Sequence, residues 1–196
     1  CLVVDVGSGG GSGSTWGSSF NSLDDAINAA NGSPNSFEIL LKGGTYYPGG
    51  QTSTNRDSAY VLKNPNIGIY GGFSGVETDK SQASPTLNPT TLCGDIGTPG
   101  DSTDNARHIL VIAPGSNDVG SGIVLSSLNI RDGNANGNTK TTYNGSEVYR
   151  NEGAGLLITC TGIGTDVSPT IENCNFENNY ASYGSAVYIK VEYGTC

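Results

Sequence analysis

The stretch "PTIENCNFENN", residues 169–179, decides the fold class of this chain. Its apolar side chains are separated by three positions and then by two: Ile171, Cys174 and Phe176. In a β-strand, side chains two positions apart lie on one face, so Cys174 and Phe176 share a face. Ile171 reaches the same interior only if the backbone bends at Glu172-Asn173, and Asn tolerates such a bend. A chain that bends every few residues and keeps its apolar side chains inward winds around a core.

The same spacing occurs 46 residues earlier. The segment "VLSSLNIRDG" (124–133) aligns with "TIENCNFENN" (170–179) and places Leu125, Leu128 and Ile130 over the three apolar residues. Two further alignments pair 108–115 with 155–162 at a shift of 47, and 153–158 with 184–189 at a shift of 31. Unequal shifts indicate loops of different length inserted at equivalent turns. The repeat therefore predicts stacked coils, a parallel β-solenoid in which each rung packs on its neighbours and Asn side chains hydrogen-bond between rungs. A β-sandwich is the alternative that the spacing leaves open.

One helix is predicted, within "FNSLDDAINAANGSP" (20–34). Ser22 can cap it, Asp25 follows three residues later, and Asn31-Gly32 ends it. Its apolar stripe is Leu23, Ala26, Ile27 and Ala30. The preceding glycine- and serine-rich stretch lacks the spacing of a phosphate-binding loop and is predicted to be an ordinary loop. Everything after the helix reads as short β segments between turns, which excludes a doubly wound α/β sheet. The β segments are 37–47, 60–73, 90–96, 108–114, 122–130, 155–162, 169–176 and 185–193.

Length and composition indicate one extracellular domain. The 196 residues form a single unit, 1–196, with the helix at about 20–31 and the rungs over 36–196. Net charge is −9, and the 9 basic residues form no cluster, which excludes a nucleic-acid footprint. No apolar run is long enough to span a membrane. Only 14% of residues are charged and 30 are glycine, as is typical of secreted β-rich proteins. The chain contains no Met and begins at Cys1, which leaves two alternatives: a targeting segment has been removed, or there never was one.

Five cysteines bear on the redox environment: Cys1, Cys93, Cys160, Cys174 and Cys196. They form no C-x-x-C pair, and the lone His108 cannot complete a zinc site with them. We expect two disulfides and one unpaired thiol, which could link neighbouring subunits, rather than five buried thiols. The pairing stays open, with Cys160 bonded either to Cys174 or to Cys196.

The chain also resembles the secreted right-handed parallel β-helix proteins, among them bacterial surface proteins and the polymorphic outer-membrane protein passengers of chlamydiae. The resemblance spans nearly the whole chain, and its most specific segments are "GIYGGFSGVET" (68–78) and "NCNFENNYASYG" (173–184). It implies an all-β, right-handed parallel β-helix (solenoid) whose first helix caps the N-terminal end. Cys93 departs from the family pattern, where this position is usually a small hydroxylated residue. The departure implies that Cys93 has been recruited into a disulfide.

Candidate catalytic groups are few, and neither a catalytic residue nor a metal ligand is predicted. Asp24-Asp25 lie where a helix N-terminus favours acidic residues. The acidic loop with Asp95, Asp101 and Asp104 could hold Ca²⁺, but acidic turn residues without a metal are the favoured interpretation. Asp132 and Glu177, in equivalent rungs, are expected to be solvated, and His108 to be structural rather than a base. The β-helix lyases use a Lys or Arg base beside Ca²⁺, and among the nine basic residues only Arg107 lies next to an acidic cluster, near Asp104.

Two further groups of residues concern ligands and modification. Six tyrosines could stack on sugars or on another protein: Tyr46, Tyr47, Tyr60, Tyr70, Tyr180 and Tyr183. Packing on half-buried β surfaces is their favoured role. Two N-x-S/T sequons, at Asn31 and Asn144, are N-glycosylation candidates in expected loops.

The predicted function follows from the chain's last segment. "SAVYIKVEYGTC" (185–196) stops within an apolar strand pattern with no visible cap, and an uncapped edge invites another strand or subunit. Either the chain continues beyond Cys196, or copies stack head to tail into a filament. We expect a non-catalytic extracellular structural or adhesive module at the cell surface that assembles end to end, binding copies of itself or other extracellular proteins and glycans. No cofactor is expected. The alternatives are a carbohydrate-active β-helix enzyme, a polysaccharide lyase or hydrolase, and a glycan-binding module.

Overall fold

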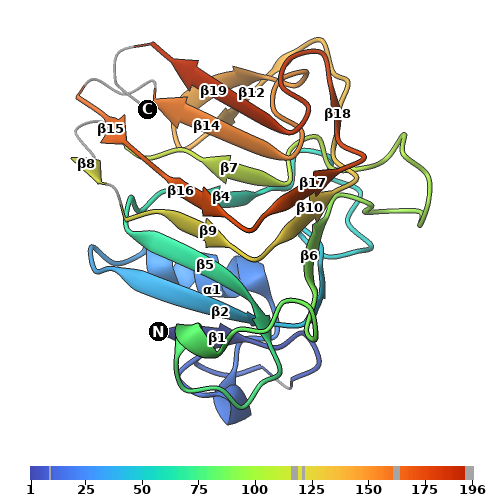
Figure 1. The fold of residues 1–196 in the computed structure, drawn as a ribbon. Helices are drawn as coiled ribbons and strands as arrows, with labels where there is room; N and C mark the ends of the chain where they lie inside the picture. Colours follow the sequence, from blue (N-terminus) through green and yellow to red (C-terminus); the bar gives the residue numbers. More distant parts are fainter. Residues whose placement is uncertain (9, 116–118, 121, 161–163, 193–196) are drawn as a thin grey trace.

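The computed structural model describes residues 1–8, 10–115, 119–120, 122–160 and 164–192. The main strands form three parallel sheets, which are the faces of a coil (Figure 1). Sheet A holds β1 (Leu2–Val4), β2 (Phe37–Lys42), β5 (Ile67–Phe73), β9 (Val124–Ser126) and β16 (Thr170–Glu172). Sheet B holds β3 (Gly44–Tyr46), β6 (Thr90–Cys93), β10 (Asn129–Arg131) and β17 (Asn175–Glu177). Sheet C holds β4 (Tyr60–Leu62), β7 (Leu110–Ile112), β14 (Leu156–Cys160) and β19 (Val187–Val191).

The chain visits the sheets in the order A, B, C and then returns to A one layer higher, so each circuit is one rung of a solenoid. Neighbouring strands within each sheet run parallel. A β-sandwich is built from antiparallel pairs, so the sandwich alternative is wrong. The parallel β-helix architecture predicted from the sequence is confirmed.

The bends between sheets lie where the spacing places them. Asn173, between β16 and β17, has a φ of 52°, and Ser127, 46 residues earlier, has a φ of 60°. The next corner repeats this pattern, with φ values of 66° at Asp132 and 52° at Asn178. The left-handed conformation turns the chain sharply and returns the next side chain to the interior. Equivalent corners therefore stack on one another, as the repeat predicts.

Strand register confirms two of the three alignments and corrects the other. Leu125 pairs with Ile171 and Ile130 with Phe176, both at the predicted shift of 46. Leu156 pairs with Val187 at the predicted shift of 31. The predicted shift of 47 is wrong, because Leu110 pairs with Leu156, a shift of 46.

The apolar pattern could not resolve this slip because both faces of sheet C are apolar. Leu156 and Ile158 point into the main core, while Leu157 packs outside it in a second cluster with Val111 and Val148. A one-residue slip exchanges the two faces of a strand, and here each face accepts a large aliphatic side chain.

The single α-helix closes the first rung. α1 (Leu23–Asn31) begins after Ser22, whose hydroxyl accepts from the Asp25 N–H at 3.4 Å, as predicted. Its buried residues join the main core beside β2, β3 and β4: Leu23, Ala26, Ile27 and Ala30. Asn64 ties the helix end to the next rung, because its Nδ2 donates to the carbonyls of Ala30, Ser33 and Asn35. A one-turn helix η1 (Trp16–Ser18) lies in the preceding loop.

Insertions leave the coil at its corners. Between sheets B and C of the fourth rung, the antiparallel hairpin β12 (Lys140–Tyr143) and β13 (Ser146–Tyr149) projects from the coil. The remaining short elements are η2 (Lys80–Gln82) and the pairs β8 (Val119–Gly120) with β15 (Asp166–Val167) and β11 (Asn134–Ala135) with β18 (Tyr180–Ala181). The hairpin explains why the sequence shift between the last two rungs is 46 residues in sheets A and B but 31 in sheet C. The rung of β9, β10 and β14 contains the hairpin, and the rung of β16, β17 and β19 does not.

Candidate interaction surface

The terminal rung, which we define as strands β16, β17, β18 and β19, is the most exposed layer of the coil. In Figure 1 it is the red layer that ends the stack. Each of its strands pairs with the rung below and with no other described strand. A strand paired on one side leaves half of its backbone N–H and C=O groups without a sheet partner. The terminal rung therefore presents a continuous β-edge in all three sheets.

The inward-facing side chains of this rung are exposed, although they occupy core positions. Ile171 stacks on Leu125 and Ile189 on Ile158, yet they are 37% and 52% exposed, against 0% and 2% for the residues beneath them. Phe176, stacked on the fully buried Ile130, is half-buried. These side chains point toward the coil axis and lack only a layer above them. The terminal rung thus presents the open end of the hydrophobic core.

The N-terminal end of the coil differs, because its edge is covered by the chain itself. The outer side of β1 bonds to residues 13 and 20: the Val3 N–H donates to the Gly13 carbonyl at 2.9 Å, and the Phe20 N–H to the Val3 carbonyl at 3.0 Å. The Trp16 indole then donates to the Glu77 carbonyl at 2.8 Å, which fixes the covering segment to the neighbouring loop. In sheet A this end is therefore closed to another strand, and α1 packs beside β1 and β4.

The cysteines do not form the predicted pair of disulfides. Cys1, Cys93 and Cys174 are free thiols, so the five cysteines can supply at most one disulfide within the chain. Cys160 is disulfide-bonded, which makes its pairing with Cys174 wrong, and Cys196 lies outside the described residues. The recruitment of Cys93 into a disulfide is also wrong. Its thiol is buried in the rung, and burial raises its pKa to about 11.

The acidic residues considered as ligands or catalysts serve the local backbone. Asp95 accepts from the Gly100 N–H, Asp101 from the Thr103 N–H and hydroxyl, and Asp104 from the Thr98 N–H, all at 2.7–3.0 Å. The three carboxylates thus close three separate turns. Within the described part of the chain, no group of three or more His, Cys, Asp or Glu side chains is placed to hold a metal ion.

Two other acidic positions have local partners. The Asp24 carboxylate accepts from the Gly49 N–H at 3.3 Å, and burial raises its pKa. Asp132 accepts from the Cys93 thiol and pairs with Arg131 at 3.2 Å, while Glu177 lies in register above Arg131 and is exposed. These contacts stabilise corners of the coil.

His108 is fully buried, as expected of a structural residue. Its Nδ1 lies 3.2 Å from the Gly153 carbonyl, and its ring meets that of Tyr143 edge-on at 5.6 Å between centroids. Its Nε2 is buried with no partner among the described residues. Burial lowers the pKa of His108 to about 4. Arg107 pairs with Asp57 at 3.1 Å rather than with Asp104, so the acid–base pairing considered from the sequence is not assembled.

The tyrosines divide into core and surface residues. Tyr46 and Tyr60 are almost fully buried, and Tyr47 and Tyr70 are half-buried. Tyr180 and Tyr183 are the exposed members of the predicted six, and both lie in the terminal rung region. Sequence reasoning did not single out Tyr149 and Tyr188, whose rings line a pocket together with Tyr183. The signal available was the alternation of Tyr188 with the inward-facing Val187 and Ile189, which places it outside the coil.

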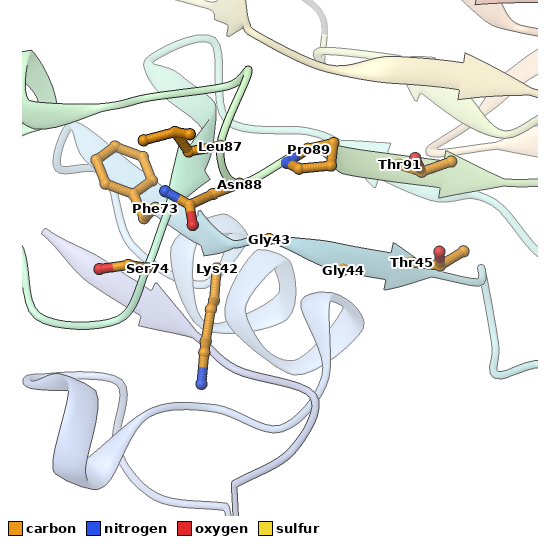
Figure 2. A pocket seen from close by; sticks show the side chains of 10 residues that line it. All are labelled: Lys42, Gly43, Gly44, Thr45, Phe73, Ser74, Leu87, Asn88, Pro89 and Thr91. Atoms are coloured by element: carbon orange, nitrogen blue, oxygen red, sulfur yellow. The ribbon is translucent and has the colours of Figure 1, made fainter.

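Another surface recess, of about 430 Å³, lies over the corner between β2 and β3 (Figure 2). Gly43 and Gly44 line it without side chains. Its polar groups include the hydroxyls of Thr45, Ser74 and Thr91 and the amide of Asn88. The Lys42 amine is directed away from the recess and pairs with Asp5 at 2.8 Å. No Asp, Glu or His lines this recess, so its described residues offer no acid–base pair for hydrolysis.

Both sequon asparagines use their side-chain amides within the fold. Asn31, at the end of α1, donates to the Val61 carbonyl at 2.8 Å and accepts from the Lys63 N–H at 2.8 Å. Asn144 is exposed at the tip of the β12–β13 hairpin, with a φ of 47°, and donates to the Ala113 carbonyl at 2.8 Å. Glycosylation at either residue stays a prediction.

Comparison with protein-family models, with curated proteins and with solved structures finds no match to this chain. Among the described residues, no helix has the length and apolar character needed to cross a membrane. The resemblance to secreted β-helix proteins thus extends as far as the parallel stacked sheets, and no family is identified. Any functional argument rests on the chain's own geometry.

Proposed function

We propose that this chain is a non-catalytic structural or adhesive β-solenoid module of the cell surface that associates through its terminal rung. One observation carries the proposal: Ile171 and Ile189 occupy core positions and are 37% and 52% exposed, while the residues stacked beneath them are buried. The cell-surface location is supported by the low charge, the glycine-rich composition and the disulfide at Cys160, while the three free thiols remove the second disulfide expected from the sequence.

A further β-layer packed on the terminal rung would stabilise it in two ways. It supplies backbone partners for the open edge of every strand, and it removes the exposed apolar side chains from water. Covering a half-exposed Ile contributes about 1 kcal/mol, at roughly 25 cal/mol per Å² of apolar area. Exposed Val191 and half-buried Phe176 lie on the same face, so a further β-layer would bury apolar surface in sheets B and C as well.

A second copy of this chain is the occupant that we propose. Head-to-tail stacking requires a free edge at both ends, and the outer edge of β1 is covered by residues 13 and 20. Two copies therefore meet terminal rung to terminal rung across a two-fold axis, so each exposed position contributes two buried side chains to the dimer, one from each copy. This arrangement narrows the end-to-end association expected from the sequence to a closed dimer.

Sedimentation velocity over a range of protein concentrations tests the proposal. The wild-type chain is expected to shift from monomer to dimer, and Ile189→Lys to raise the dissociation constant at least about 30-fold, because each dimer loses two buried Ile side chains. Leu87→Lys is the matched control: Leu87 is 80% exposed in the loop after β5, far along the chain from the terminal rung. Ile171→Lys repeats the test in sheet A. A wild-type chain that stays monomeric at all concentrations, or equal dimerisation of Ile189→Lys and Leu87→Lys, contradicts the proposal.

A further inference from the structure

A pocket of about 310 Å³ lies on the outside of sheet C, where the hairpin rejoins the coil. It is lined by Tyr149, Asn151, Glu152, Tyr183 and Tyr188. Tyr149 is the last residue of β13, Tyr183 lies in the turn before β19, and Tyr188 lies within β19. Three tyrosines and one carboxylate thus come together from two segments of the chain. The closest residues of the two segments, Glu152 and Tyr183, are 31 positions apart in the sequence.

The walls of this tyrosine pocket are fixed by backbone hydrogen bonds. The Tyr183 N–H donates to the Asn151 carbonyl at 3.1 Å, and the Gly153 N–H to the Tyr183 carbonyl at 2.9 Å. Glu152 and Tyr183 form a parallel bridge between the two rungs. The Tyr149 N–H donates to Glu152 Oε2 at 3.2 Å, which fixes the carboxylate to the backbone of Tyr149. The site is therefore formed before any ligand arrives.

Charge is the feature that selects a ligand here. Glu152 is 7% exposed and forms no ion pair with any described residue. The face of each tyrosine ring carries the negative part of its quadrupole, so rings and carboxylate favour positive charge together. Burial and, to a smaller extent, the Glu152 carboxylate raise the pKa of Tyr188, which therefore stays a neutral phenol at physiological pH.

We propose that the tyrosine pocket binds an organic cation that carries a quaternary ammonium group, such as a choline headgroup or a trimethylated lysine side chain. A neutral ligand of the same size would cover Glu152 without compensating its charge, and burying an uncompensated carboxylate is costly. A quaternary ammonium group compensates the charge and places its methyl groups against the rings. A neutral sugar gains the stacking but not the charge compensation.

The chain already shows one of these rings holding an ammonium group. The Lys140 amine lies over the Tyr149 ring, 5.0 Å from its centroid, within the usual range of a cation–π contact. Lys140 does not line the tyrosine pocket. The Tyr149 ring is thus electron-rich enough to hold one cation, and it also forms a wall of the pocket.

This inference goes beyond the proposed association and does not depend on it. We would titrate the purified chain with choline chloride and, separately, with Nε-trimethyllysine, and follow the methyl resonances of each probe by NMR. The matched neutral probe is 3,3-dimethylbutan-1-ol, in which carbon replaces the ammonium nitrogen of choline; methyl glucoside tests the sugar. Saturable binding of at least one cation, at least tenfold tighter than both neutral probes, is the expected result. The tighter of the two cations identifies the source of the ammonium group.

Three variants locate the binding site. Glu152→Gln keeps the acceptor for the Tyr149 N–H and removes the charge, and Tyr183→Leu removes one ring; each is expected to weaken binding about tenfold. Tyr180→Leu is the control, because Tyr180 is exposed on the same rung and does not line the pocket. Circular dichroism spectra that match the wild type establish that the variants fold. Equal binding of choline and its neutral analogue, binding of the sugar alone, no saturable binding, or full affinity in Glu152→Gln overturns the inference.

Discussion

Acid should destabilise this protein through a single residue, His108, before its carboxylates begin to titrate. The chain contains one histidine, and burial lowers its pKa from 6.5 to about 4. Between pH 6.5 and pH 4, His108 is therefore protonated in the unfolded chain and neutral in the folded chain. A proton bound only by the unfolded state lowers the free energy of unfolding as pH falls. Stability is thus complete above pH 6.5 and is lost progressively toward pH 4.

The magnitude follows from the size of the shift. Each pH unit between the two pKa values changes the free energy of unfolding by about 1.4 kcal/mol, so about 2 kcal/mol is lost between pH 8 and pH 5. Asp57 and Arg107, the charged groups near the ring, act on its pKa in opposite directions and less than burial does. The carboxylates of lowered pKa, such as Asp57, lose their stabilising contribution only below their ordinary values, outside this window.

Urea unfolding at several pH values between 8 and 5 measures this loss. The comparison is His108→Asn, whose amide can donate to the Gly153 carbonyl as Nδ1 does but does not titrate. The variant is expected to be less stable at pH 8 and to change little down to pH 5. Asp24, whose pKa is raised, contributes in the opposite direction, and subtracting the variant removes its contribution. A wild-type stability that does not change with pH, or the same slope in both proteins, would refute the reasoning.

Three other substitutions test the coil itself, each by urea unfolding. Ser127→Gly should raise the free energy of unfolding by about 0.5–1 kcal/mol, because Ser127 has a φ of 60° that glycine adopts without strain; no gain would contradict the corner argument. Asn64→Ala should cost about 1–3 kcal/mol, since it removes the donor to the buried Ala30 carbonyl and to the partly buried carbonyls of Ser33 and Asn35, whereas a neutral effect would mean that water replaces it. Asp57→Asn should cost about 1–3 kcal/mol and speed proteolysis of the hairpin, because the carboxylate pairs with Arg150 at 2.7 Å and Arg107 at 3.1 Å; unchanged proteolysis would show that the hairpin is held otherwise.

The sequence predicted the coil because its corners carry a local signal. Asn173 tolerates the left-handed conformation, and the apolar spacing around it reports where the chain bends. Ser127 takes the same conformation without any such preference, so that corner was visible only through its alignment with Asn173. Where both faces of a strand are apolar, as at Leu156 and Leu157, the apolar pattern does not distinguish the correct strand register from one shifted by a single residue.

Other features depended on distances that a sequence does not contain. The five cysteines suggested two disulfides, but pairing requires side chains to meet, and Cys93 lies buried beside Asp132 instead. The hairpin has a local signal, the Asn144-Gly145 pair, but the same residues also belong to a sequon, and the sequence analysis predicts a loop there. Both residues have positive φ, 47° and 83°, as a two-residue hairpin turn requires. The tyrosine pocket gave no signal, because its walls come from segments that only the coil brings together.

The corner between sheets B and C has a consequence for protein engineering. Residues 47–59, 94–109 and 132–155 all leave the coil there, and each time the chain rejoins sheet C in register with its neighbours. Segment length at this corner is thus decoupled from the pitch of the coil, since the parallel ladders on either side fix the strands. Foreign peptides grafted in place of the hairpin tip at Asn144-Gly145 would be displayed from a scaffold whose rungs do not need to be redesigned.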